Sequence, residues 1–293
     1  MKRFALRYAI LPIALMIACN IVYAQPQAAI RSAPPVTISS MRDPVDKSYR
    51  KMLKGMELFE KLHGMAPTAT LRYKLLPRRP DTNMDGIVLK IVGDSITIPV
   101  PIAPDHTFIL QRNDKALRED AAVIPNRKAG SMTWRTEIRT PGLPPNTRRL
   151  GDLRLECRVG LEADLVSNDP PLIGQLASLV RGLTGYCDAA EPQYLFFSER
   201  PLFSVTLTAG GRSEILSVDQ LYAGISRHPI SESELSYCDC QVLLDRTYFL
   251  PLGDRSWPDD TLVRLEYMDD SAVTHQSLEA VPSAAPRASK EAR

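Results

Sequence analysis

The chain has 293 residues, and its 36 Lys and Arg side chains against 34 Asp and Glu give a formal net charge of only +2. A balance this close to neutral gives no reason to expect nucleic acid as a partner. The 24 prolines, together with short apolar runs that alternate with polar residues, favour strands and tight connections over a helical protein.

Residues 1–24 are expected to be a signal peptide. Basic residues open the segment, an apolar run covers 9–18, and small residues at Val22 and Ala24 precede a cleavage point. A second route is lipidation of Cys19, since Met-Ile-Ala-Cys at 16–19 resembles a bacterial lipoprotein box, and the lipid would anchor the protein to a membrane surface. Both routes predict an exported protein of the periplasm or cell envelope.

Residues 25–42 are rich in Ala, Pro and Ser and are expected to form a flexible leader. A helix is predicted over 43–64, because apolar residues recur there at helical spacing. Asp43 can cap its free amides, Pro44 suits the first helical position, and Gly64 can end it.

Residues 65–165 change to a period of two, which predicts a β-sandwich-like domain. The predicted strands are ATLRYKLL, GIVLKIV, SITIPV, HTFIL, SMTWRTEI and DLRLECRV. In the last of these, residues 152–159, apolar and charged side chains alternate strictly, as in a strand with one solvated face.

A helical linker is predicted over 166–190, with its helix at 169–184, and a smaller β domain over 191–270. In that domain, LFSVTLTAGGRSEILSV reads as a hairpin with its turn near Gly210 and Gly211. Residues 271–293 are expected to be disordered. The predicted fold class is therefore mainly β with a few helices, in two β-rich domains joined by a helical segment.

DTNMDG at 81–86 opens like a calcium-binding EF-hand loop. Asp81, Asn83, Asp85 and Gly86 match its first six positions. The twelfth position should be a bidentate Glu and is Val92, and strands are expected on both sides. We therefore interpret the segment as a surface turn.

VGDSIT at 92–97 is similar to the nucleophile block of GDSL-type esterases, with Ser95 in the place of the nucleophile. That family also needs an Asp three residues before a His, and none of the four histidines has one. Pro99 and Pro101 follow, so a helix cannot begin there. We interpret the stretch as two strands joined by a turn at Gly93 and Asp94.

The phrase LKIVGDSITIPVPIAPDHTFIL, within residues 66–160, resembles transthyretin-like or carboxypeptidase-regulatory-like β-sandwich modules. Pro101, Asp105, Phe108 and Leu110 carry the resemblance. Modules of this kind are typically non-catalytic, so the resemblance implies a structural or binding domain.

One dense basic region covers 127–158. On one sheet face it could bind lipopolysaccharide phosphates, an acidic glycan or an acidic protein. The alternative is a solvated strand face that is neutralised by neighbouring acidic residues. The candidate binding residues are Arg127, Lys128, Trp134, Arg135, Arg139, Arg148 and Arg149.

Four cysteines follow the predicted signal peptide: Cys157, Cys187, Cys238 and Cys240. An even number in an exported chain favours disulfides, and the three possible connectivities stay open. A metal-binding or redox role for Cys238-Asp239-Cys240 is the alternative.

These observations predict a non-enzymatic envelope protein that serves as a structural or ligand-binding accessory. No cofactor is expected, and the partner would be an unknown envelope protein or an acidic glycan. Membrane contact is expected only through lipidation of Cys19. The alternatives are a glycan or lipopolysaccharide binder that uses the basic region, and a secreted hydrolase of unrecognised type.

Overall fold

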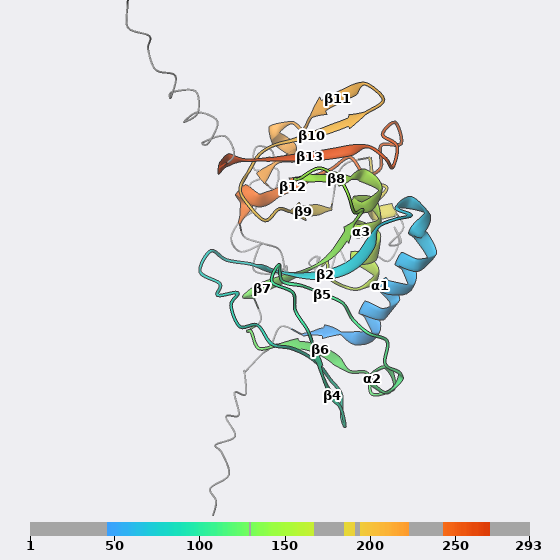
Figure 1. Ribbon diagram of the computed structural model, residues 1–293, viewed down its shortest axis with the longest axis vertical. Coiled ribbons are helices and arrows are strands. Elements are labelled where there is room, and N and C mark those ends of the chain that lie inside the picture. Colours follow the sequence, from blue (N-terminus) through green and yellow to red (C-terminus); the bar gives the residue numbers. More distant parts are fainter. Residues whose placement is uncertain (1–45, 129, 167–184, 191–193, 223–242, 270–293) are drawn as a thin grey trace, which may run out of the picture. The chain divides into compact units, whose positions relative to one another are not determined.

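The computed structural model describes residues 46–128, 130–166, 185–190, 194–222 and 243–269, all within one compact unit, Met41–Arg293 (Figure 1). These residues are mainly β with a few helices, which confirms the predicted fold class. The predicted signal peptide, leader, second helix and C-terminal tail, as well as Cys19, Cys238 and Cys240, lie outside the described residues. None of the described helices has the length and apolar character needed to cross a membrane.

The N-terminal part consists of two antiparallel sheets that share one apolar core. The first has the order β1 (Lys47–Ser48), β6 (Ala122–Pro125), β3 (Leu89–Val92) and β4 (Thr97–Val100), and the second β5 (Thr107–Phe108), β2 (Thr70–Pro77) and β7 (Met132–Arg139). Ile91 and Val123 from the first sheet and Tyr73, Leu75 and Trp134 from the second lie in the same buried cluster. The strands predicted in ATLRYKLL, GIVLKIV, SITIPV and SMTWRTEI are confirmed, with bounds that differ by one to three residues.

The hairpin of β3 and β4 differs from the prediction by one residue at its turn. The Gly93 N–H donates to the Ile96 carbonyl at 3.0 Å, so the two loop residues are Asp94 and Ser95 rather than Gly93 and Asp94. A Cβ at position 93 would lie 2.5 Å from a Glu119 carboxylate oxygen, so a side chain there would require the Glu119 carboxylate to shift.

Helix α1 covers Tyr49–Leu62 and begins later than predicted. Lys47 and Ser48 pair with β6 as the short strand β1, so the chain is still extended there. The Ser48 side chain then caps the helix by accepting from the Lys51 N–H at 3.4 Å. The prediction that the helix covers 43–64 from a cap at Asp43 is therefore wrong at its start. Helix α2 is short and covers Asp114–Arg118.

Helix α3, Leu150–Glu162, is the largest departure from the prediction, because residues 152–159 were expected to form a strand. The helix lies between the two β-rich parts (Figure 1). Its residues Leu153 and Cys157 join the C-terminal core, while Leu155 and Val159 join a separate cluster with Ile138. A helix that is buried on opposite sides can carry apolar residues at every second position, and this imitates a strand pattern.

The C-terminal part is a four-stranded antiparallel sheet beside a two-stranded one. The first has the order β11 (Arg212–Ile215), β10 (Leu202–Ala209), β13 (Leu262–Tyr267) and β8 (Thr147–Arg149), and the second pairs β12 (Thr247–Phe249) with β9 (Leu195–Phe197). Three-residue 3₁₀ helices lie at His63–Met65, Val218–Gln220 and Leu244–Arg246.

The predicted hairpin of β10 and β11 is confirmed, with positive φ angles of 53° and 83° at Gly210 and Gly211. Strand β8 lies within the residues assigned to the first domain, yet it pairs with β13 of the second. The two β-rich parts are therefore joined through β8 and α3 and not only through the predicted linker.

Candidate functional site

The calcium-like loop at 81–86 is organised around an arginine. The Arg127 guanidinium donates to the carbonyl oxygens of Asn83 at 3.0 Å and Asp85 at 2.5 Å, and Asn83 Oδ1 accepts from the Asp85 N–H at 2.7 Å. The positively charged guanidinium of Arg127 therefore already binds the carbonyl oxygens that a calcium ion would need. In the described ranges, no three His, Cys, Asp or Glu side chains are grouped so that they could hold a metal ion.

Ser95 is tied to a carboxylate. Its hydroxyl donates to Glu119 Oε1 at 2.6 Å, and its backbone N–H donates to Oε2 at 2.9 Å. These bonds lower the pKa of Glu119 below its usual value. The arrangement fastens the β3–β4 turn to the chain after α2, which is a structural task.

The basic region does not form one exposed face. Trp134 is completely buried in the N-terminal core. Arg135 is buried beside it, donates to the Leu165 carbonyl at 2.8 Å and stacks over the Phe197 ring at 4.4 Å. Arg148 is also buried, and it pairs with Glu156 at 2.6 Å.

The other candidate binding residues of that region are dispersed. Arg127 holds the loop at 83–85, Lys128 is exposed nearby, and Arg139 pairs with Glu137. Arg149 lies on β8, next to the buried Arg148 but on the opposite side of the strand. Only residues that alternate along a strand share a face, so sequence proximity alone did not bring these side chains together.

A buried charged cluster fills the space between β2–β7 and β9–β12. Lys74 pairs with Glu199, and Arg148 pairs with Glu156. The remaining cavity is about 30 Å³, enough for about one water molecule. Lys74 alternates along β2 with the core residues Tyr73 and Leu75, yet it is only 6% exposed because β9 covers that face of the sheet.

Carboxylate pKa values diverge inside this cluster. Burial alone would raise the pKa of Glu137, but Arg148, Arg139 and Lys74 outweigh it, and the pKa is lowered. Burial raises the pKa of Glu156 despite the opposing charge of Arg148. Since each charge has a partner of opposite sign, the cluster acts first as an ionic joint between two sheets.

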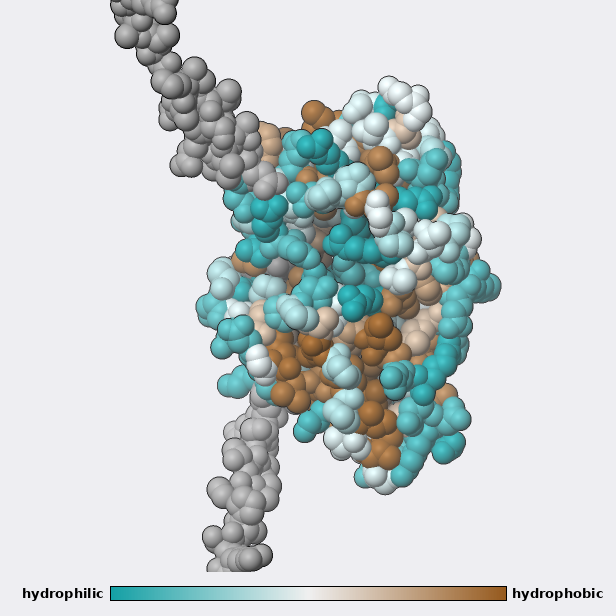
Figure 2. Space-filling model, in the orientation of Figure 1, coloured by the Kyte–Doolittle hydropathy of each residue, from teal (hydrophilic) through white to brown (hydrophobic). Residues whose placement is uncertain are grey.

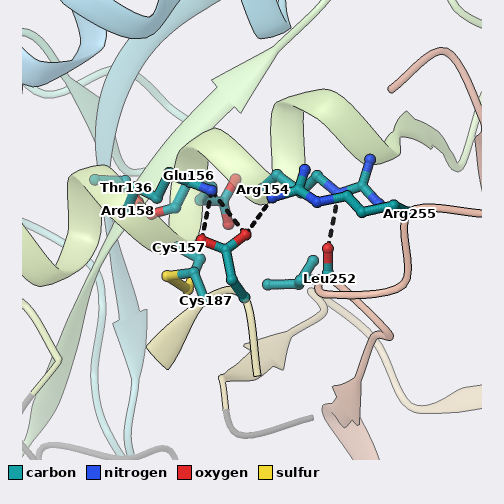
Figure 3. The surroundings of a disulfide bond; sticks show 9 residues. Thr136, Arg154, Glu156, Cys157, Arg158, Cys187, Leu252 and Arg255 are labelled. Atoms are coloured by element: carbon teal, nitrogen blue, oxygen red, sulfur yellow. Dashed lines mark hydrogen bonds and ion pairs between the residues drawn. A yellow bond between two sulfur atoms is a disulfide. The ribbon is translucent and has the colours of Figure 1, made fainter. Parts of the chain in front are cut away.

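A disulfide joins Cys157 on α3 to Cys187, with a Cα–Cα distance of 6.0 Å (Figure 3). Of the three connectivities that the sequence left open, the structure therefore has the one that pairs Cys157 with Cys187. The next residues on each side are also joined, because Arg158 donates to both carboxylate oxygens of Asp188 at 2.8 Å. Arg255 pairs with the same carboxylate.

Arg154 organises the loop before β13. Its guanidinium donates to the carbonyl oxygens of Leu252, Asp254 and Trp257 at 2.7–2.9 Å and pairs with Asp259 at 2.6 Å. Figure 3 shows Arg154 and Leu252 beside the disulfide. Arg154 is 3% exposed, so its role is internal.

An open groove of about 690 Å³ lies on the outer side of β13 and β8. Its lining includes Pro144, Pro145, Phe203, Leu262 and Arg264. In the view of Figure 2, hydrophobic residues gather over the N-terminal part and hydrophilic ones dominate the C-terminal part. The most exposed large apolar side chains nevertheless belong largely to the C-terminal part: five of the seven in the described residues are Phe203, Ile215, Val218, Leu262 and Met268.

Comparisons with known proteins add no relative: no family model, no curated protein and no solved structure matches this chain.

Proposed function

We propose that the chain is a non-enzymatic, exported protein of the cell envelope that binds a ligand on the outer face of the β11-β10-β13-β8 sheet. The observation that carries this proposal is the groove of about 690 Å³ on that face. Its volume falls within the range that is usual for ligand sites, which combine apolar walls with a few polar groups.

The composition of the groove supports a binding role. Phe203 lies at an irregularity in the pairing of β10 with β13 and is 58% exposed. Leu262 follows on β13 and is 37% exposed, beside the two prolines at 144–145. An exposed aromatic ring next to rigid prolines offers apolar contact area at low cost in conformational entropy.

Export is supported by the disulfide as well as by the predicted signal peptide. Disulfides persist in oxidising compartments and are rare where thiols are kept reduced. The pair Cys157 and Cys187 is buried and holds α3 to the segment at 185–190, as expected of a structural bridge.

Co-sedimentation with isolated envelope fractions tests the proposal. Mature wild-type protein should sediment with the envelopes, and Phe203→Ser with Leu262→Ser should weaken this binding by about tenfold or more. Burial of one large apolar side chain is worth roughly 1.5–3 kcal/mol, so loss of even one of the two contacts accounts for a tenfold weaker binding.

A matched control replaces two other exposed apolar residues, Ile109→Ser and Val88→Ser, which are 58% and 48% exposed. The control should bind like wild type. Equal losses in the two double variants, or no sedimentation of the wild-type protein, would contradict the proposal.

A further inference from the structure

Strand pairing defines which side chains share the outer face of the C-terminal sheet. Directly paired residues of neighbouring strands point to the same side. The row Glu214, Leu207, Val263 and Arg148 is the inward one, since Leu207, Val263 and Arg148 are buried. The two flanking rows therefore point outward.

These outward rows mix hydroxyl groups and arginines. The first row is Ile215, Thr206, Arg264 and Thr147, and the second is Ser213, Thr208, Leu262 and Arg149. The two arginines are diagonal neighbours across β13 and β8, a relation in which side chains are roughly 7–8 Å apart.

The two arginines on this face are weakly paired with acidic residues of the described part of the chain. Arg149 makes no ion pair with any residue in the described part of the chain. Among the described residues, Arg264 forms an ion pair with Glu266 alone, at a long 3.9 Å, and its side chain is 68% exposed. Arg148, the neighbour of Arg149 in the chain, differs from both: it is buried and forms an ion pair with Glu156 at 2.6 Å.

We propose that this face binds an acidic polysaccharide, with uronate carboxylates at Arg149 and Arg264. Guanidinium groups bind carboxylates through two parallel hydrogen bonds, so two diagonal arginines can hold successive acidic sugars of one chain. The hydroxyls of Thr208 and Ser213 are 3.5 Å apart and form a polar surface for sugar hydroxyls.

The exposed ring of Phe203 at the same groove provides a flat apolar surface for the face of a sugar ring. Arg149 and Arg264 outnumber the one carboxylate of the groove lining, Glu266, which accepts a hydrogen bond from Ser204 at 2.6 Å, so the charge of this face favours an anionic polymer. The aromatic ring with the neighbouring hydroxyls favours a glycan over a simple anion. This inference rests on the proposed function, because it names the ligand class of the same outer face. Arg264 lines the groove, and Arg149 lies beside it, opposite the groove residue Leu262.

Binding of alginate oligomers, which are uronate chains, to the mature full-length protein tests the inference by calorimetry. The double variant Arg149→Gln with Arg264→Gln should bind at least tenfold more weakly than wild type, and binding should weaken as salt is raised. Both side chains face outward, and a circular dichroism melt checks that the variant folds.

The control is Lys54→Gln with Lys128→Gln, which removes two exposed positive charges elsewhere, on α1 and in the basic region. It should bind alginate within twofold of wild type, and neutral dextran should not bind the wild-type protein. Equal losses in both double variants, equal binding of dextran, or tighter binding of anionic lipid vesicles than of alginate would overturn the inference.

The two proposals fail in different ways. If the Phe203 and Leu262 variant loses envelope sedimentation but the wild-type protein does not bind alginate, the glycan class is wrong and the binding face stands. If sedimentation is also unaffected, both are wrong.

Discussion

Loss of the bridge between Cys157 and Cys187 should destabilise the protein strongly. The two cysteines are 30 residues apart, and the chain-entropy relation for a loop of that size gives about 3.6 kcal/mol at 25 °C. For a folded part of this size, 1 kcal/mol shifts the melting temperature by roughly 2–4 °C, so the expected decrease is about 7–14 °C. The native fold should persist below that temperature, because Arg158 and Asp188 still join the same two segments.

The assay is thermal unfolding by circular dichroism, with and without reductant. A background of Cys238→Ser and Cys240→Ser leaves the one disulfide that the structure shows, so reduction acts on a single bond. Cys187→Ala in that background should melt like the reduced protein. A decrease of less than about 2 °C would mean that the bridge does not constrain the unfolded chain as the loop length requires.

Three further predictions concern the charged interior and the calcium-like loop. Arg154→Met should lower the free energy of unfolding by about 3–5 kcal/mol in urea titration, because it removes the ion pair with Asp259 and the hydrogen bonds to three carbonyl groups; a loss under 1 kcal/mol would contradict this. The pKa of Glu137 is lowered from its ordinary 4.5, so its contribution is present above that pH and is lost as pH falls through the folded value. The stability gap between wild type and Glu137→Gln should therefore be seen near pH 7 and shrink toward pH 3, and a gap independent of pH would be inconsistent with the ionic joint. Calcium should leave the melting temperature unchanged, since Arg127 already binds the loop carbonyl of Asp85, whereas a calcium-dependent rise of several degrees would reverse that interpretation.

Strands were predictable where one face of the sheet meets an apolar core. In β2, Tyr73 and Leu75 alternate with charged residues, and in β7 Trp134 does the same, so period and strand agree. The alternation could not show that the other face of this sheet, which carries the charged residues, is also covered by protein. Lys74 has the position of a solvated residue in this alternation but is buried beneath β9, and its ion-pair partner Glu199 is 125 residues away in the chain.

Helix α3 was missed for a related reason. Arg154 and Glu156 occupy positions that a strand would give to solvent, but both are buried and ion-paired. Arg154 pairs with Asp259, 105 residues away, and Glu156 pairs with Arg148, 8 residues before it on β8. A charged side chain signals a solvated face only when such a partner is absent, and the partner comes from tertiary structure. The local sequence therefore could not distinguish a strand from a helix buried on opposite sides.

In the candidate site, residues that are neighbours in the sequence lie on different faces of a strand. The basic region offered seven neighbouring residues as one surface, whereas strand alternation sends Arg148 inward and Arg149 outward. The residue that Arg149 meets on the outer face is Leu262, which is 113 positions away in the chain. Only the register of β8 against β13 brings these side chains to one face of the sheet, and no local motif indicates that register.

Photo-crosslinking in envelope preparations tests most directly whether the outer face of the C-terminal sheet is the binding face. A benzophenone side chain would replace Phe203 in one variant and Ile109 in another, since both residues are 58% exposed. Irradiation should join envelope material to the protein at position 203 and not at 109. Adducts at 109 alone, or equally at both positions, would contradict the assignment of the binding face to this sheet.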